Sequence, residues 1–161
     1  MALRLEDIEL IKQLKHRYMR CLDTADTAGL RKCLADDVSI NYVGGSYHIQ
    51  AKGADEIVSM LAGGMYNDKY IGVHTVHHPE ITVHDDNTAD GIWYLVDFAI
   101  NFAIGKTTEG SAIYKDKYVK KNGAWLIQHS EYSRIYERFE DIQGKPNITS
   151  HLYGKLFGKP A

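Results

Sequence analysis

The residues best suited to chemistry are three closely spaced histidines, His74, His77 and His78, in a β-branched stretch that ends at Pro79. Imidazole is the only side chain whose ordinary pKa lies in the neutral range, so it can take up and release a proton there. Alternation along a strand places His74 and His78 on one face and His77 on the other. This pattern favours His74 as a general base lining a pocket, with His78 beside it as a substrate contact.

A tyrosine and an aspartate precede the histidines on the first predicted helix. Tyr18 lies on its apolar face, either as a core aromatic or as a phenol that donates a hydrogen bond or proton to a substrate oxygen. Asp23 lies about 7.5 Å further along the helix axis. It is either a helix-end residue or the carboxylate that holds His74 by one ring nitrogen and supports its charge.

A second pair of charged residues falls in the later strands. Asp97 interrupts an apolar run, and a bare buried carboxylate is costly unless it is paired or neutralised. Arg134 is either the ion-pair partner of Asp97, a surface charge, or a cation that closes the pocket and orients Asp97 or a substrate oxygen.

Aromatic residues recur in and beside the predicted strands, and they suit a cavity with apolar walls and hydroxyl tips. Ordinary packing in the sheet explains most of them. We expect Tyr42, Trp93 and Tyr114 to contact substrate.

A metal site is the main alternative for the histidines, since three imidazoles and Asp23 could in principle bind zinc. However, His77 should point away from His74 and His78, and no cysteine or glutamate lies at ligand spacing nearby. We therefore expect neither a metal nor another cofactor.

Helical spacing in the first part of the chain gives way to strand patterns later. Apolar residues recur every three or four positions over 5–22, where acidic residues in the first turn and later basic ones, Lys15 among them, suit the helix dipole. A short helix around Leu30 and a third over 54–61, stopping at Gly63-Gly64, follow. Strands are expected at 38–43, 73–78, 81–83, 89–102, 112–120 and 124–135, with a kink or bulge at Pro79 and a hairpin at Asn122-Gly123.

This order of elements predicts an α+β fold: one strongly curved antiparallel sheet wrapped around N-terminal helices. Such a fold leaves a cavity where sheet and helix meet. The 161 residues suffice for a single domain, 1–161, in which residues 141–161 form a loop or C-terminal arm.

Composition narrows the partners and the compartment. The net charge is only -2 and no Lys/Arg run occurs, so we expect no nucleic acid. Two cysteines and an N-terminus without a signal-peptide pattern favour a reducing, cytoplasmic setting. The longest apolar stretch, 92–104, contains Asp97 and Asn101 and is too short to span a bilayer. A small hydrophobic molecule remains the expected ligand.

Several motifs resemble the SnoaL-like group of the nuclear-transport-factor-2-like superfamily, whose fold is a cystatin-like α+β cone. They are the opening helix leading into Leu22-Asp23, Leu34-Ala35-Asp36-Asp37-Val38, the strand with His74 followed by Pro79-Glu80-Ile81, and Lys121-Asn122-Gly123-Ala124-Trp125. They span residues 8–136, and the resemblance implies a homo-oligomer, a dimer or trimer.

A more specific likeness is to the bacterial bile-acid 7α-dehydratases. It is carried by Arg20-Cys21-Leu22-Asp23, Pro79-Glu80-Ile81-Thr82, Trp93-Tyr94-Leu95 with Asp97, Asp116-Lys117-Tyr118, Arg134-Ile135-Tyr136-Glu137 and Ile148-Thr149. The resemblance implies an active site made of Tyr18, Asp23, His74, Asp97 and Arg134. Scytalone dehydratase and hexachlorocyclohexane dehydrochlorinase are similar at the helix aspartate and strand histidine only.

Residues and resemblance together predict a cofactor-free lyase that eliminates water from a steroid-like or polycyclic substrate with a carbonyl-activated C–H bond. His74 would take the proton, and Tyr18 would stabilise an enolate oxygen or assist departure of the hydroxyl. Two alternatives stay open: an isomerase or cyclase of the same fold, and a non-catalytic binding or small-subunit role.

Overall fold

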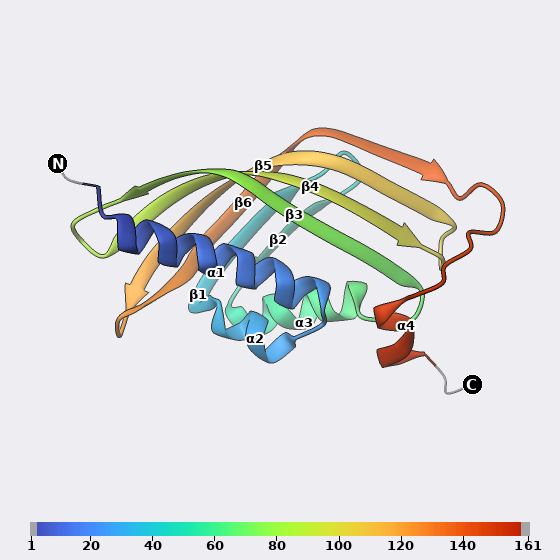
Figure 1. The fold of residues 1–161 in the computed structure, drawn as a ribbon, viewed down its shortest axis with the longest axis horizontal. Helices are drawn as coiled ribbons and strands as arrows, with labels where there is room; N and C mark the ends of the chain where they lie inside the picture. The colour runs from blue at the N-terminus through green and yellow to red at the C-terminus, as the bar shows by residue number, and fades with distance from the viewer. Residues whose placement is uncertain (1–2, 159–161) are drawn as a thin grey trace.

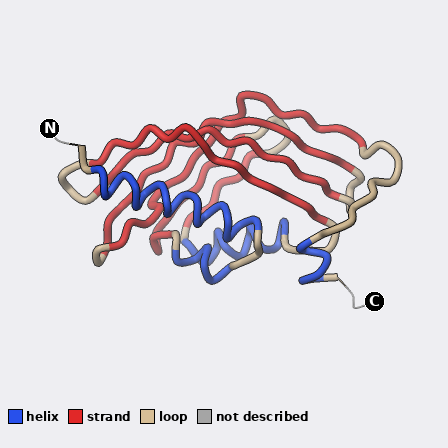
Figure 2. The backbone as a smooth tube through the Cα atoms, viewed as in Figure 1, coloured by secondary structure: helices blue, strands red, loops and turns tan. Residues whose placement is uncertain are grey.

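The computed structural model describes residues 3–158, in which helices lie along one face of a curved, open six-stranded sheet (Figures 1 and 2). The elements in chain order are α1 (Leu5–Asp23), α2 (Thr27–Lys32), β1 (Leu34–Val43), β2 (His48–Lys52), α3 (Ala54–Met65), β3 (Tyr70–Val83), β4 (Thr88–Asn101), β5 (Lys106–Lys121), β6 (Ala124–Asp141) and α4 (Leu152–Phe157). The predicted α+β architecture with a curved sheet over N-terminal helices is confirmed.

The strand order is β2-β1-β6-β5-β4-β3, and every neighbouring pair is antiparallel except β1 and β6. The expectation of a wholly antiparallel sheet is therefore wrong for this pair. Hairpins impose antiparallel pairing on β3 through β6. No hairpin joins β1 to β6, so their relative direction is set by tertiary packing instead.

Bulges bend the long strands and change which residues face inward. In β3 the register shifts between His77 and Glu80, where His78 adopts φ 50°. In β6 the register against β5 shifts twice, at Gln128 and at Ile135, which have no partner residue. An extra residue in one strand reverses the alternation beyond it and increases the local bend. The expected bulge near Pro79 is confirmed, whereas nothing in the sequence predicts those of β6.

Helix α1 crosses beneath the sheet and is held at both ends (Figure 1). Near its start, the Asp7 carboxylate accepts hydrogen bonds from Lys120 Nζ and Trp125 Nε1, each at 2.8 Å. Near its end, the Leu22 carbonyl accepts a hydrogen bond from Tyr153 of α4 at 2.9 Å. These contacts fix the direction in which the C-terminal half of α1 presents its side chains.

Several element boundaries differ from the prediction. Helix α3 continues to Met65, so Gly63 and Gly64 lie within the helix instead of ending it. Strand β2 was not predicted. Strands β5 and β6 extend beyond the predicted 112–120 and 124–135, since their polar ends are stabilised by pairing with each other rather than by burial.

The predicted C-terminal arm contains the short helix α4. Tyr153 is buried there, and His151 Nε2 lies 2.8 Å from the Tyr70 carbonyl. This segment therefore docks beside the end of α1 and the start of β3. Residues 159–161 of the arm, like residues 1–2, lie outside the described part of the chain. Within residues 3–158, no helix is long and apolar enough to cross a membrane.

Candidate active site

A cavity of about 560 Å³ opens between α1, α3 and the inner face of the sheet. Apolar side chains form much of its wall, including Leu22 of α1, Met60 and Leu61 of α3, and Leu95 of β4. Its polar groups include tyrosine hydroxyls, the His74 imidazole, the Asp97–Arg134 pair, and the side chains of Ser46, Asn101 and Thr108. Its size falls in the range of about 300–1,000 Å³ that is usual for small-molecule sites.

The imidazole in this cavity belongs to His74, and it is held by Asp23 from the last turn of α1. His74 Nδ1 lies 2.6 Å from Asp23 Oδ1, and the His74 backbone N–H donates to Asp23 Oδ2 at 2.9 Å. The carboxylate accepts at both oxygens, which sets the tautomer with hydrogen on Nδ1. Nε2 is then the free nitrogen that can take a proton. The contact expected between Asp23 and His74 is present, and its catalytic role stays a prediction.

Tyr18 and Tyr42 form a pair of buried phenols at the cavity wall, with their hydroxyl oxygens 3.2 Å apart. Tyr114 lies beside them, its ring edge-on to that of Tyr42. Burial raises the pKa of all three hydroxyls well above the ordinary tyrosine value. They therefore remain protonated at neutral pH and act as hydrogen-bonding groups. The structure places Tyr18, Tyr42 and Tyr114 on the cavity, as predicted.

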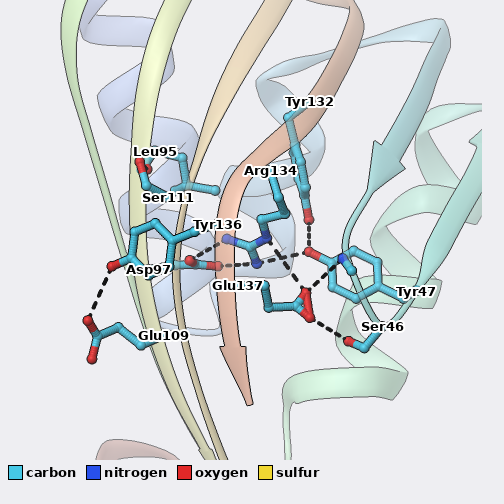
Figure 3. Close-up of polar contacts among 11 residues, drawn as sticks. Ser46, Tyr47, Leu95, Asp97, Glu109, Ser111, Tyr132, Arg134, Tyr136 and Glu137 are labelled. Atoms are coloured by element: carbon cyan, nitrogen blue, oxygen red, sulfur yellow. Dashed lines mark hydrogen bonds and ion pairs between the residues drawn. The ribbon is translucent and has the colours of Figure 1, made fainter.

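Asp97 and Arg134 face each other across the inner surface of the sheet (Figure 3). Arg134 Nη1 and Nη2 donate to the two Asp97 oxygens at 2.5 and 2.8 Å. Nη2 also donates to the Tyr47 hydroxyl at 2.9 Å, and Tyr47 is hydrogen-bonded to Tyr132. Burial alone would lower the pKa of Arg134, but these hydrogen bonds to Asp97 raise it, so the guanidinium stays charged. The pairing of Asp97 with Arg134 is confirmed.

Loop and strand-end residues support the far side of this ion pair (Figure 3). The Glu137 carboxylate accepts hydrogen bonds from the Ser46 hydroxyl at 2.7 Å and the Gly45 backbone N–H at 3.1 Å. One Glu137 oxygen lies 4.0 Å from Arg134 Nε. The β1–β2 loop is thereby attached to β6 next to the cavity, with Tyr47 as part of its wall.

Two predicted substrate contacts lie outside the cavity. Trp93 faces inward on β4, but it is fully buried further along the sheet, where its Nε1 donates to the Tyr118 hydroxyl at 2.9 Å. Trp93 precedes Asp97 by four residues, about 13 Å along a strand, which explains the separation. His78 falls in the β3 bulge, which turns it outward, exposed and next to His77 and Tyr94. Simple alternation therefore predicted the wrong face for His78.

The sequence interpretation missed a buried ion pair beneath the cavity. Lys15 Nζ lies 2.7 Å from Asp116 Oδ2, and both side chains are 0% exposed. Desolvation lowers the pKa of Lys15, while the Asp116 carboxylate opposes this shift. Lys15 falls on the same helical stripe as Leu14 and Tyr18, and Asp116 alternates with Tyr114 and Tyr118. These spacings are the signal in the sequence, whereas Lys15 is counted above only among the basic residues that suit the helix dipole.

No group of three or more His, Cys, Asp or Glu side chains in residues 3–158 is arranged to hold a metal ion. His77 and His78 contact each other through their Nδ1 atoms at 2.6 Å, on the outer face of the sheet.

Comparison with known proteins concerns the family and the fold. A sequence model of the SnoaL-like domain family matches residues 3–131. A candidate scytalone dehydratase from Novosphingobium aromaticivorans has a similar structure, with a TM-score of 0.73 and 17% identity over 91% of this chain and 96% of the other. Hexachlorocyclohexane dehydrochlorinase LinA-type3 from Novosphingobium barchaimii gives 0.71 and 16%, over 91% and 97%. A protein of Novosphingobium aromaticivorans, described as nuclear-transport-factor-2-like with a cystatin-like fold, gives 0.66 and 22%, over 81% and 83%.

Proposed function

The chain belongs to the SnoaL-like family, and from this premise we propose that it is a cofactor-independent lyase that eliminates water from a hydrophobic, carbonyl-activated substrate. The observation that carries the proposal is the Asp23–His74 pair on the wall of a largely apolar cavity. A carboxylate-held imidazole in such a setting is a general base suited to a C–H proton that a neighbouring carbonyl has already acidified. Two structurally similar proteins are named as a dehydratase and a dehydrochlorinase, which supports elimination chemistry.

The proposed reaction uses His74 first as a base and then as an acid. Nε2 takes the C–H proton, and the electron pair of that bond forms a conjugated enolate. Asp23 stabilises the imidazolium through the Nδ1–H hydrogen bond of 2.6 Å. Re-formation of the carbonyl then expels the hydroxyl group, which leaves as water once it receives a proton. Tyr18 contacts a substrate oxygen during these steps, and a positioned acid or base contributes about 10²–10⁴-fold each.

Asp97 and Arg134 act as a fixed, internally neutral pair that orients the substrate. Asp97 occupies both Nη atoms of the guanidinium, so the free charge facing the cavity is small. A neutral carbonyl or hydroxyl therefore suits this wall better than a full negative charge.

The substrate we propose is a 3-oxo-4-ene steroid with a 7-hydroxyl group. Its enone acidifies the C–H bond next to the leaving group, as a base without a metal requires. The cavity offers apolar walls from α3 and β4 and hydroxyl groups from Tyr18, Tyr42 and Tyr114. A rigid polycyclic compound matches such a surface at little cost in conformational entropy.

Incubation with a panel of 3-oxo-4-ene 7-hydroxysteroids tests this function. Elimination produces an extended dienone, which is detected by its absorbance, and a product lighter by one water, which is detected by mass spectrometry. We expect turnover by the wild-type chain and a loss of at least about 10²-fold in His74→Ala. His77→Ala is the matched control, because the same side chain on the same strand stacks on Tyr94 outside the cavity.

The outcomes separate the remaining functions. A product of unchanged mass would replace dehydration by isomerisation or cyclisation at the same base. Equal activity of His74→Ala and wild type would remove the imidazole from the chemistry. Binding of the steroid without any turnover would favour the non-catalytic role.

We also propose that the chain forms a homo-oligomer through the outer face of the sheet. Alternate residues of β4 that face away from the helices are apolar and about 40% exposed: Ile92 at 38%, Tyr94 at 40%, Val96 at 42% and Phe98 at 40%. Contiguous apolar surface of this kind is typical of protein contacts. Light scattering behind size-exclusion chromatography tests this, and Val96→Glu should shift an oligomer toward the monomer.

A further inference from the structure

A chain of hydroxyl groups connects Tyr18 to the buried ion pair beneath the cavity. The Ser130 hydroxyl donates to Asp116 Oδ1 at 2.7 Å, and the Tyr42 hydroxyl lies 3.4 Å from Ser130 Oγ. The Tyr18 hydroxyl lies 3.2 Å from that of Tyr42. All four side chains are at least nine-tenths buried.

The buried end of the chain fixes the direction of its hydrogen bonds. Asp116 lies 2.7 Å from the Lys15 ammonium and 2.7 Å from the Tyr118 hydroxyl, so its carboxylate is an acceptor. Ser130 has one hydrogen and uses it on Asp116. Tyr42 must then donate to Ser130.

The same count of hydroxyl hydrogens sets the direction of the hydrogen bond between Tyr42 and Tyr18, at the cavity wall. Tyr42 also has a single hydrogen, so both of its contacts are made only if Tyr18 is the donor between the two phenols. The Tyr18 oxygen then faces the cavity with its lone pairs. We propose, on the basis of the proposed function, that Tyr18 is a hydrogen-bond acceptor for the leaving hydroxyl of the substrate, and that Ser130 and Asp116 are positioning residues that set this direction.

This assignment gives Tyr18 a definite task. A phenol that accepts the hydrogen of the substrate hydroxyl leaves a lone pair of that hydroxyl free to receive a proton. The His74 imidazolium, which has just taken the C–H proton, supplies it, and the C–O bond breaks to release water. The proton removed from carbon thus leaves with the hydroxyl, and no external acid is consumed. It also makes a substrate hydroxyl preferred over a ketone at this position, because a ketone cannot donate.

Nuclear magnetic resonance of protein labelled at the tyrosine Cζ carbons tests the direction without any ligand. A phenol that donates a hydrogen bond gains electron density on oxygen, and its Cζ resonance moves downfield, whereas a phenol that accepts one moves upfield. Ser130→Ala frees the Tyr42 hydrogen to be donated to Tyr18. We expect the Tyr18 resonance, assigned by its loss in Tyr18→Phe, to move upfield in Ser130→Ala and to stay in place in Ser130→Thr.

Tyr118→Phe is the matched control, since it also removes one hydroxyl donor from Asp116 but is not connected to Tyr18. The Tyr18 resonance should not move in this variant. Equal shifts in Ser130→Ala and Tyr118→Phe, or no shift in Ser130→Ala, would overturn the proposal. If Ser130→Ala fails to fold, Tyr42→Phe removes the acceptor of the Tyr18 hydrogen and should move the resonance in the same direction.

A binding comparison between a hydroxysteroid and the matching ketone tests whether the direction of the Tyr18 hydrogen bond determines substrate specificity. In the His74→Ala background, which prevents turnover, we expect a 3-oxo-4-ene 7α-hydroxysteroid to bind about tenfold more tightly than its 7-oxo analogue. Ser130→Ala should reduce or reverse this ratio, and Tyr118→Phe should keep it. An unchanged ratio in Ser130→Ala would count against the assignment. Should neither steroid bind, the proposed substrate is wrong, while the resonance experiment still decides the direction of the chain.

Discussion

Substitution of Asp23 by asparagine tests the reasoning about the site most directly. The carboxylate accepts from His74 twice, once from Nδ1–H at 2.6 Å and once from the backbone N–H at 2.9 Å. An asparagine side chain has one acceptor oxygen and one NH₂ donor, so it can keep only one of these contacts. If its oxygen keeps the backbone N–H, its NH₂ faces Nδ1 and selects the tautomer with hydrogen on Nε2, which cannot act as a base.

The expected loss follows from these contacts. A hydrogen bond to a charged group contributes about 1.5–3 kcal/mol, and Asp23→Asn loses one bond together with the charge that supports the imidazolium. The Asp23 and His74 side chains are 19% and 15% exposed, so solvent screens part of the interaction. We expect kcat to fall by about 10²–10³-fold, equivalent to about 2.7–4 kcal/mol in activation free energy. KM should change little, because it is His74 and not Asp23 that lines the cavity.

The assay is steady-state formation of the dienone by wild type and Asp23→Asn, with Asp90→Asn as the control. Asp90 and His84 form a comparable pair, 2.9 Å apart, but they are 59% and 42% exposed and neither lines the cavity. Asp90→Asn should therefore keep wild-type activity. If Asp23→Asn kept more than about one third of kcat, Asp23 would not be supporting the base, and the proposed mechanism would fail.

Three further predictions concern stability. The hydrogen bond from Lys120, followed by that from Trp125, lowers the pKa of Asp7 from 3.8 to about 2. Between these two pH values the unfolded chain binds more protons than the folded chain, so the free energy of unfolding should fall as the pH drops from about 4 to 2. Urea unfolding should show Asp7→Asn less stable than wild type by about 2 kcal/mol at pH 7 and by almost nothing at pH 2; an equal difference at both pH values would refute the linkage. Lys15→Met leaves Asp116 as an unpaired buried charge, so it should cost about 3–5 kcal/mol in the same assay, and a cost under 1 kcal/mol would show that Asp116 finds another partner. Gly63→Ala should raise stability by about 0.5–1 kcal/mol, because the residue is inside α3 with open space around an added Cβ; a lower melting temperature would contradict this.

Local patterns predicted the placement of the site's polar residues where it depends on one helix or one strand, while the resemblance alone assigned these residues to one active site. The helical stripe places Tyr18 beneath the sheet. Asp23 lies at the C-terminal end of α1, where a carboxylate is unfavourable unless a hydrogen-bonding or cationic group faces it. An isolated carboxylate in an apolar strand requires a cation, and Arg134 supplies it. In each case the cost of burying a polar group limits the arrangements that remain.

Features that depend on several strands could not be predicted in this way. The outward turn of His78 follows from a bulge, and bulges reflect strand pairing rather than the composition of one segment. The Tyr47 hydroxyl reaches Arg134 because β2 pairs with β1 and the loop between them lies over β6. The pairing of Lys15 with Asp116 joins residues far apart in the chain, and nothing in either local pattern names the partner.

The bulge at Gln128 determines which side chains of strand β6 face the helices and which face away from them. The residue without a partner sets which row of side chains beyond it faces the helices: Ser130, Tyr132 and Arg134 do, and Tyr132 and Arg134 line the cavity. Deleting Gln128 would exchange those two rows at once, whereas most point substitutions alter a single wall position. An insertion or deletion of one residue in this strand would therefore change several wall positions of the cavity in a single step.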